Sequence, residues 1–220
     1  MKNELKKRLI SSLVIIPLTF FFIIKGSYLF NVFLCACLFA AFYEWYLISK
    51  KYKYQLFGYI LLCVSFYCVF CLRNDFGDKS LILFLFVLLV CIFTDLGGYL
   101  FGNIFKGPKI TRISPNKTYA GVVGGYICSL IIIFFVFKYS DLLFDVNLNL
   151  SIETFKYVAL ISTISQIGDL IISYFKRLSK IKDTGKIIPG HGGILDRIDG
   201  MIFAFPFSYI VFNFNTLTFL

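Results

Sequence analysis

The chain has 220 residues, of which 59% are hydrophobic and 15% are charged, and its mean hydropathy is +0.82. Soluble domains carry about 25% charged residues, so this composition excludes a soluble enzyme, a disordered chain and a coiled coil. The formal net charge of +10 is typical of a nucleic-acid-binding protein, but it also suits a membrane protein whose basic residues collect in loops.

Seven apolar stretches predict about seven transmembrane helices, because a helix needs about 20 apolar residues to cross a bilayer. In chain order they cover residues 9–24, 28–48, 56–72, 81–101, 120–137, 155–175 and 201–219. The first stretch follows a basic N-terminus, as a signal peptide does, but the next residues offer no small-residue cleavage site, so we expect a retained helix. The expected fold class is an all-α polytopic integral membrane protein with a cytoplasmic N-terminus.

The basic residues are distributed unequally between the two sides that these spans define. One side carries 17 of the 22 lysines and arginines if the N-terminus is cytoplasmic, which fits the enrichment of basic residues in cytoplasmic loops. This predicts a multi-pass protein of the inner cell membrane with its active site facing the cytoplasm, and no nucleic-acid partner. We expect N-terminal transmembrane helices over 1–80 and a catalytic region over 81–220, with cytoplasmic loops at 102–119 and 178–197.

Acidic residues inside spans are costly and usually functional. Asp95 lies in the fourth span, and Glu44 lies near the cytoplasmic end of the second, where it either pairs with a cation or takes part in a site. In the sixth span, Asp169, Ser173 and Lys176 are spaced i, i+4 and i+7, so they share one helix face. This stripe is either part of a site or a buried Asp–Lys pair that joins two helices.

The loop after the sixth span carries residue types that bind anions and metal ions. Pro189-Gly190 and Gly192-Gly193 bracket His191, and glycines let backbone N–H groups converge on an anion. Asp196 and Asp199 are spaced i, i+3, so both carboxylates can face one point. Carboxylates among cations suit Mg²⁺, which also takes substrate phosphates as ligands, and this combination is typical of phosphoryl or nucleotidyl transfer.

A second loop, Ser-Pro-Asn-Lys-Thr at residues 114–118, precedes the fifth span. It combines hydroxyl groups with a lysine but does not match the Walker pattern of P-loop proteins. It either contacts nucleotide phosphates or caps the following helix through Ser114 or Thr118.

Residues 173–199 resemble the signature of the phosphatidate cytidylyltransferase family, also called CDP-diacylglycerol synthases. The pattern S-x-x-K-R-x4-K-D-x-G-x3-P-G-H-G-G-x-x-D-R-x-D is met at every fixed position. Asp95, Gly98-Tyr99, Gly102 and the 114–118 loop extend the resemblance over roughly residues 90–205. The chain departs from the family at Ala120, where Glu is frequent, and at Asn103, where a basic residue is frequent.

The resemblance implies a nucleotidyltransferase that transfers the cytidylyl group of CTP to phosphatidate, giving CDP-diacylglycerol and pyrophosphate for phospholipid synthesis. It implies CTP, phosphatidate and the bilayer as partners, Mg²⁺ as cofactor with a second cation left open, and a homodimer. The alternatives are a polytopic transporter and another membrane enzyme of phospholipid synthesis. Acids clustered with glycines and basic residues at one surface favour the transferase over the transporter.

The hypothesis assigns a role to each candidate residue. The catalytic group comprises Ser173, Lys176, Arg177, Asp183, His191, Asp196, Arg197 and Asp199. The substrate-binding group comprises Asp95, Ser114, Asn116, Lys117, Thr118, Lys182, Gly192 and Gly193. The expected metal ligands are Asp169, Asp183, Asp196 and Asp199. Two roles stay open: His191 either donates to a phosphate or fixes the glycine-rich turn, and Arg177 either holds a phosphate or is an interfacial cation.

Overall fold

The computed structural model of the chain describes residues 2–111, 114, 117–185, 187, 190 and 192–214, without the side chains of residues 2–10 and 12. These residues form helices and connecting loops, and an isolated antiparallel bridge joins Lys109 to Thr118. The helices are α1 (Lys2–Lys25), α2 (Ser27–Ser49), α3 (Gln55–Asn74), η1 (Gly77–Lys79), α4 (Ser80–Phe105), α5 (Tyr119–Lys138), α6 (Ser140–Phe144), α7 (Ile152–Leu178), α8 (Leu195–Ile198) and α9 (Met201–Phe214).

Five of the described helices are long and apolar enough to cross a membrane: α2, α3, α4 with the preceding η1, α5 and α7. The Leu13–Lys25 part of α1 and all of α9 are shorter apolar helices. Five of the seven predicted spans therefore coincide with helices long enough to cross a membrane, the first lies in α1, and the last begins with α9. Residues 215–219 of the last predicted span lie outside the described residues. The predicted all-α polytopic membrane fold is confirmed.

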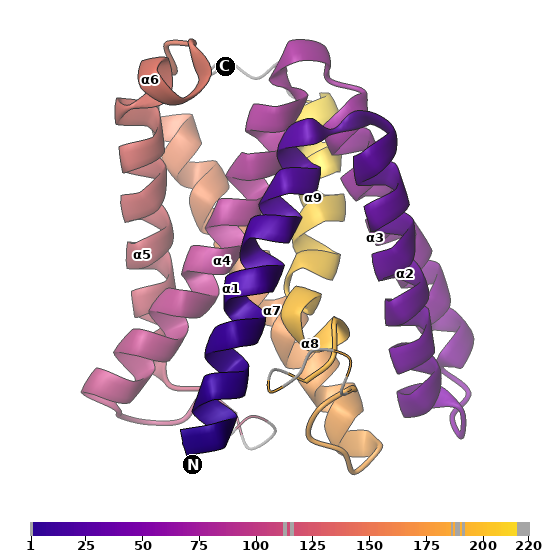
Figure 1. Cartoon of the computed structure of the whole chain (residues 1–220). Helices are drawn as coiled ribbons and strands as arrows, with labels where there is room; N and C mark the ends of the chain where they lie inside the picture. Colours follow the sequence, from indigo (N-terminus) through magenta and orange to yellow (C-terminus); the bar gives the residue numbers. More distant parts are fainter. Residues whose placement is uncertain are drawn as a thin grey trace.

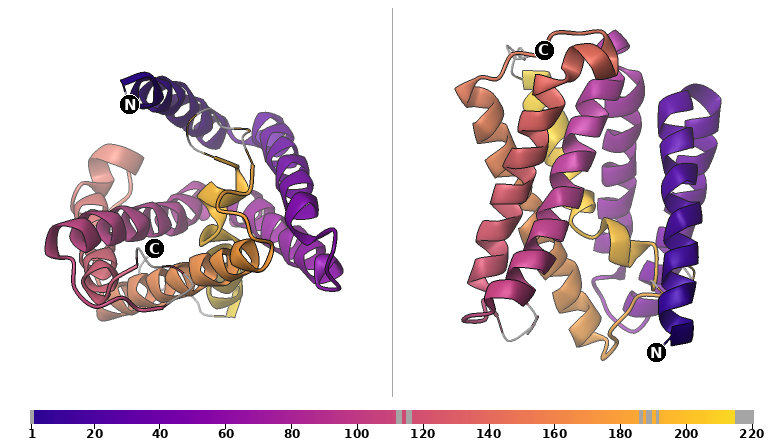
Figure 2. Two further views of the ribbon diagram at one scale, coloured as in Figure 1. Left: turned by 90° about the horizontal axis from the view of Figure 1, so that it is seen from below. Right: turned by 60° about the vertical axis from the view of Figure 1, so that its left-hand side comes forward.

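Successive long helices run in opposite directions along the bundle (Figure 1). The start of α1, the loop at 50–54 and the described residues of the loops at 106–118 and 179–194 consequently lie at one end, which we call the basic end. Viewed from this end, the segment that follows α7 lies between α2 on one side and α4 and α7 on the other (Figure 2). Exposed lysines line this end, at Lys50, Lys51, Lys53, Lys106, Lys109, Lys180 and Lys182.

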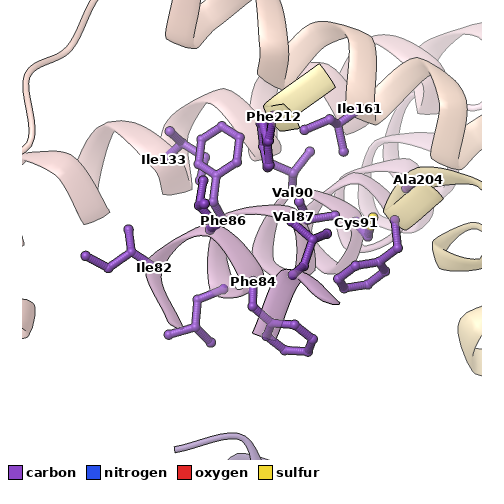
Figure 3. Close-up of a cluster of buried hydrophobic side chains, with 14 of the residues drawn as sticks. Ile82, Phe84, Phe86, Val87, Val90, Cys91, Ile133, Ile161, Ala204 and Phe212 are labelled. Atoms are coloured by element: carbon purple, nitrogen blue, oxygen red, sulfur yellow. The ribbon is translucent and has the colours of Figure 1, made fainter. Parts of the chain in front are cut away.

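The half of the bundle away from the basic end has a core of apolar side chains centred on α4. Leu83, Val87 and Val90 of α4 are fully buried, and they pack with residues of α3, α5, α7 and α9. Figure 3 shows α4 side chains of this cluster beside Ile161 of α7 and Phe212 of α9. Close packing of this kind holds helices together inside a bilayer, where the surrounding lipid is itself apolar.

In the basic half, α4 and α5 pack through glycines. A Cβ atom on Gly97 would lie 2.3 Å from the carbonyl oxygen of Gly124, and one on Gly121 would lie 2.7 Å from the carbonyl oxygen of Gly98. Only glycine allows the two backbones to approach so closely. This contact fixes the start of α5, and with it the loop that carries Lys117, against the part of α4 that carries Asp95.

Candidate active site

The polar stripe on α7 forms one wall of the candidate site. The Ser173 hydroxyl donates a hydrogen bond of 3.2 Å to Asp169 Oδ1, so these residues share a helix face as the spacing predicts. The other oxygen of Asp169 forms an ion pair with Nζ of Lys117, from the loop before α5. The stripe therefore contacts one of the two loops that sequence analysis singled out.

Lys176, two helical turns after Asp169, connects the stripe to the second of these loops by pairing with two carboxylates. Its Nζ lies 3.0 Å from Asp196 Oδ1 and 3.6 Å from Asp199 Oδ2. Lys176 is 8% exposed and Asp199 is 7% exposed. The predicted convergence of the two carboxylates is present, with Asp196 on the short α8 and Asp199 just after it. The buried Asp–Lys pairing considered as an alternative is present here too.

The two carboxyl groups have opposite pKa shifts. Burial and the neighbouring charge of Asp169 raise the pKa of Asp199 well above its ordinary value, although Lys176 acts in the other direction. Burial also acts to raise the pKa of Asp196, but hydrogen bonds from the backbone N–H groups of Gly193 and Thr184, together with Lys176, hold that pKa below its ordinary value. Asp196 is therefore held by donors on both oxygens, whereas Asp199 lies beside a like charge.

Asp196 and Glu44 hold the base of the loop that follows α7. Asp196 Oδ2 accepts hydrogen bonds from the backbone N–H groups of Thr184 and Gly193, at 2.8 and 3.0 Å. The Thr184 hydroxyl donates to Glu44 Oε2 at 2.9 Å, and the backbone N–H groups of Ile194 and Leu195 also donate to Glu44. The partners of Glu44 are thus uncharged donors, not the cation that sequence analysis considered. The position of an acidic residue inside a predicted span marks Glu44 as a candidate, but sequence spacing does not reveal its hydrogen-bond partners.

The loop at 106–118 is closed by backbone hydrogen bonds. Ile110 N–H donates to the carbonyl of Lys117 at 3.0 Å, and Tyr119 N–H donates to the carbonyl of Pro108 at 3.2 Å. Thr118 is the N-cap of α5, because its hydroxyl accepts a hydrogen bond of 3.1 Å from Gly121 N–H. The capping alternative is therefore confirmed for Thr118, and Lys117 is the residue that reaches the polar stripe.

Other predicted residues lie at the margin of this cluster. Arg177 does not face the cluster, because a helix position next to Lys176 points about 100° away from it. Its side chain is exposed and donates to the carbonyl of Ile181 at 3.2 Å. Lys182 and Asp183 are exposed, and Ser114 is half-buried.

Asp95 and Arg197 keep accessible side chains and interact electrostatically with one another. Gly192 has a φ of +92°, which favours glycine. His191 and Asn116 lie outside the described residues.

Carboxylate oxygens are suitable ligands for Mg²⁺, but within the described part of the chain no three His, Cys, Asp or Glu side chains are grouped closely enough to hold one ion. The four-carboxylate centre expected from the sequence is not assembled there, since Asp196 is held by Lys176 and two N–H groups and Asp183 is exposed. Asp169 and Asp199 remain as a neighbouring pair, and each also pairs with a lysine, Lys117 and Lys176 respectively. Mg²⁺ is commonly held by one or two carboxylates together with substrate phosphates and water, so this pair fits the ion.

Fold and site together define a multi-pass membrane protein whose basic end gathers lysines and carboxylates around two loops. Residues 46–215 match the cytidylyltransferase family, and the chain belongs to this family. It is 45% identical over 129 residues to a phosphatidate cytidylyltransferase of Staphylococcus haemolyticus, and the match covers 58% of this chain and 47% of that one.

Two further relatives carry the same name. The chain is 36% identical over 165 residues to the phosphatidate cytidylyltransferase of Staphylococcus saprophyticus, and 36% identical over 166 residues to that of Staphylococcus aureus strain COL. Each match covers 74% of this chain and 62% of the relative. The chain thus spans less than two thirds of the length of these relatives.

Proposed function

We propose that this protein transfers the cytidylyl group of CTP to phosphatidate, giving CDP-diacylglycerol and pyrophosphate. The observation that carries the proposal is the meeting of Lys117 and Lys176 with Asp169 and Asp199 at one end of the bundle. Membership of the cytidylyltransferase family supports the reaction class. The names of the relatives support the two substrates.

In this reaction a phosphate oxygen of phosphatidate attacks the α-phosphorus of CTP. A new P–O bond forms, the bond from the α-phosphorus to the bridging oxygen breaks, and pyrophosphate leaves with that oxygen. The second pKa of a phosphate monoester is about 6, so the nucleophile is already mostly ionised near pH 7 and needs no general base. The main barrier is the approach of two anions, which positive charge fixed at the site lowers.

The basic side chains divide this task between them. Lys117 and Lys176 contact phosphate oxygens, and Ser173 orients one of them through its hydroxyl. Each lysine is paired with a carboxylate, so its position is fixed before the phosphates bind. Arg177 and Arg197, which are exposed, contact the phosphates of CTP from the aqueous side.

We also propose Mg²⁺ as the cofactor, with Asp169 and Asp199 as the residues that would hold it. When bound, it would neutralise charge on the phosphates and on the departing pyrophosphate. One or two carboxylates together with substrate phosphates are a common ligand set for this ion, which supports Asp169 and Asp199 in this role. A second cation stays a prediction.

The site is proposed to face the cytoplasm across the inner cell membrane. Clustering of lysines at the basic end supports this orientation, because cytoplasmic loops are enriched in basic residues. CTP would then arrive from the cytoplasm and phosphatidate from the bilayer. We also propose that the protein is a homodimer, as the family resemblance implies. Light scattering of the detergent-solubilised protein tests it, and a protein mass of 25.3 kDa, that of one chain, would contradict it.

The experiment uses purified protein, phosphatidate in mixed micelles, Mg²⁺ and CTP labelled in either the α- or the γ-phosphate. We expect the α-label in the lipid and the γ-label in pyrophosphate. Asp169→Asn should lower the rate about 10²- to 10³-fold. Asp141→Asn, at an exposed acid of the other end, should not change it. A folded wild-type protein that labels no lipid with Mg²⁺ or Mn²⁺ would refute the proposal.

A further inference from the structure

Glu44 lies on α2, two residues before the segment that matches the family. Its side chain is fully buried, at 0% exposure. Burial of a carboxyl group is costly unless hydrogen bonds compensate for the lost water. The partners of Glu44 therefore indicate what this residue is for.

All of these partners belong to the loop that follows α7 and to the start of α8. Glu44 Oε2 accepts from the Thr184 hydroxyl at 2.9 Å and from Leu195 N–H at 2.8 Å, and Oε1 accepts from Ile194 N–H at 2.9 Å. These partners are 140 to 151 residues away in the sequence. One carboxyl group thus joins both ends of the loop to α2.

The loop is shaped around this carboxyl group. A Cβ atom on Gly193 would lie 2.3 Å from Glu44 Oε2, and a Cβ atom on Gly185 would lie 2.6 Å from Oε1. Any other residue at either position would push the carboxyl group aside. This explains two glycines of the loop by the space that they leave for Glu44.

A continuous chain of hydrogen bonds leads from Glu44 to the candidate site. Thr184 donates its hydroxyl to Glu44 and its backbone N–H to Asp196 Oδ2, at 2.9 and 2.8 Å. Asp196 in turn accepts from Lys176 Nζ at 3.0 Å. A shift of the Thr184 backbone would therefore move the carboxylate that orients Lys176.

We propose that Glu44 is a positioning residue for cytidylyl transfer, acting through Thr184 and Asp196 on Lys176. This inference rests on the proposed function. If Glu44 has this role, then α2 contributes to catalysis through a residue that precedes the segment matching the family. Displacement of a catalytic group by about 1 Å can cost about 10²-fold in rate. Since the hydrogen bonds of Glu44 go to Thr184, Ile194 and Leu195 and not to the lysines assigned to the phosphates, its loss should lower kcat and leave KM for phosphatidate unchanged.

The test compares Glu44→Gln with wild type and with Glu153→Gln, at an exposed carboxyl group on α7 at the other end. The amide introduced by Glu44→Gln would present an N–H₂ group to one of the loop donors, so a hydrogen bond is lost and two donors face each other. We expect kcat to fall 10- to 100-fold, KM for phosphatidate to stay within twofold, and Glu153→Gln to behave as wild type. An unchanged kcat, or an increase in KM alone, would overturn the proposal.

Amide hydrogen exchange provides a readout that does not depend on activity. The amides of Ile194 and Leu195 should exchange at least tenfold faster in Glu44→Gln, and equal exchange rates would also overturn the proposal. If wild type forms no product, the proposed function fails, whereas the exchange measurement still tests the anchoring by Glu44. If Glu44→Gln does not fold, Thr184→Val replaces it, with an expected fall in kcat of about fivefold and the same overturning outcome.

Discussion

The two halves of α4 and α7 carry different kinds of residue. Toward the end opposite the basic one, α4 buries Leu83, Val87 and Val90, and α7 buries Val158 and Ile161. Toward the basic end, the same helices present Asp95, Gly97, Asp169, Ser173 and Lys176. One pair of helices therefore supplies a packed core along one part of its length and a site along the other.

This contrast has an energetic meaning. Apolar side chains in the first half stabilise the fold by close packing. Charged side chains in the second half are costly to bury, and pairing mainly offsets that cost. Substitutions in the first half should therefore lower stability with little effect on catalysis per folded molecule, and conservative substitutions in the second half should do the reverse.

The largest effect is expected for Asp199→Asn. The substitution keeps the size of the side chain and the oxygen that accepts from Gly200 N–H, but it removes the proposed metal-binding carboxylate. Activity should fall about 10²- to 10³-fold. The melting temperature should not fall, because burial and the charge of Asp169 already disfavour a charged group at this position.

The control for this prediction is Asp78→Asn, at an exposed acid of the other end. It should leave both the rate of lipid labelling and the melting temperature as in wild type. Full activity in Asp199→Asn would remove Asp199 from the proposed site.

Phe84→Ala tests the opposite half. Phe84 is 4% exposed, and the centroid of its ring lies 5.5 Å from the ring centroid of Phe30 and 5.3 Å from that of Phe205. Truncation leaves a cavity, so the free energy of unfolding should fall by about 3 kcal/mol. Activity per folded molecule should stay within twofold of wild type, as measured at a temperature where both proteins are folded.

Phe134→Ala is the matched control, because Phe134 is 44% exposed on α5. Its stability should stay near that of wild type. An equal loss of stability in the two variants would mean that burial at Phe84 is not what stabilises this half.

A smaller effect is expected where the two halves meet, at the glycine contact between α4 and α5. In Gly97→Ala the added methyl group would meet the carbonyl of Gly124, so the helices must separate and the free energy of unfolding should fall by about 2 kcal/mol. Gly98→Ala, with 3.7 Å to its nearest atom, should be tolerated. Thermal unfolding of both variants in one detergent measures the difference, and equal stability would contradict it.

Much of the fold could be predicted from composition and hydropathy. The five described helices that are long enough to cross a membrane follow from apolar length, because that length is dictated by the bilayer. The shared face of Asp169, Ser173 and Lys176 follows from helix periodicity, and the hydrogen bond between Ser173 and Asp169 agrees with it. Local periodicity of this kind is independent of tertiary packing.

The remaining features depend on contacts between distant segments. Glu44 meets its partners 140 residues or more along the chain, and two of the donors are backbone N–H groups, which no side-chain pattern reveals. The short α8, separated from α9 by Asp199 and Gly200, likewise could not be predicted from an apolar stretch. The resemblance places Arg177 in the catalytic group with Lys176, but it does not reveal that these adjacent helix positions face different directions.

The most direct test measures lipid labelling per folded molecule and melting temperature together, for Asp199→Asn and Phe84→Ala in one detergent. We predict opposite outcomes: Asp199→Asn keeps its melting temperature and loses activity, and Phe84→Ala keeps its activity and loses stability. If both properties fall together in both variants, the division between a supporting half and a catalytic half is wrong.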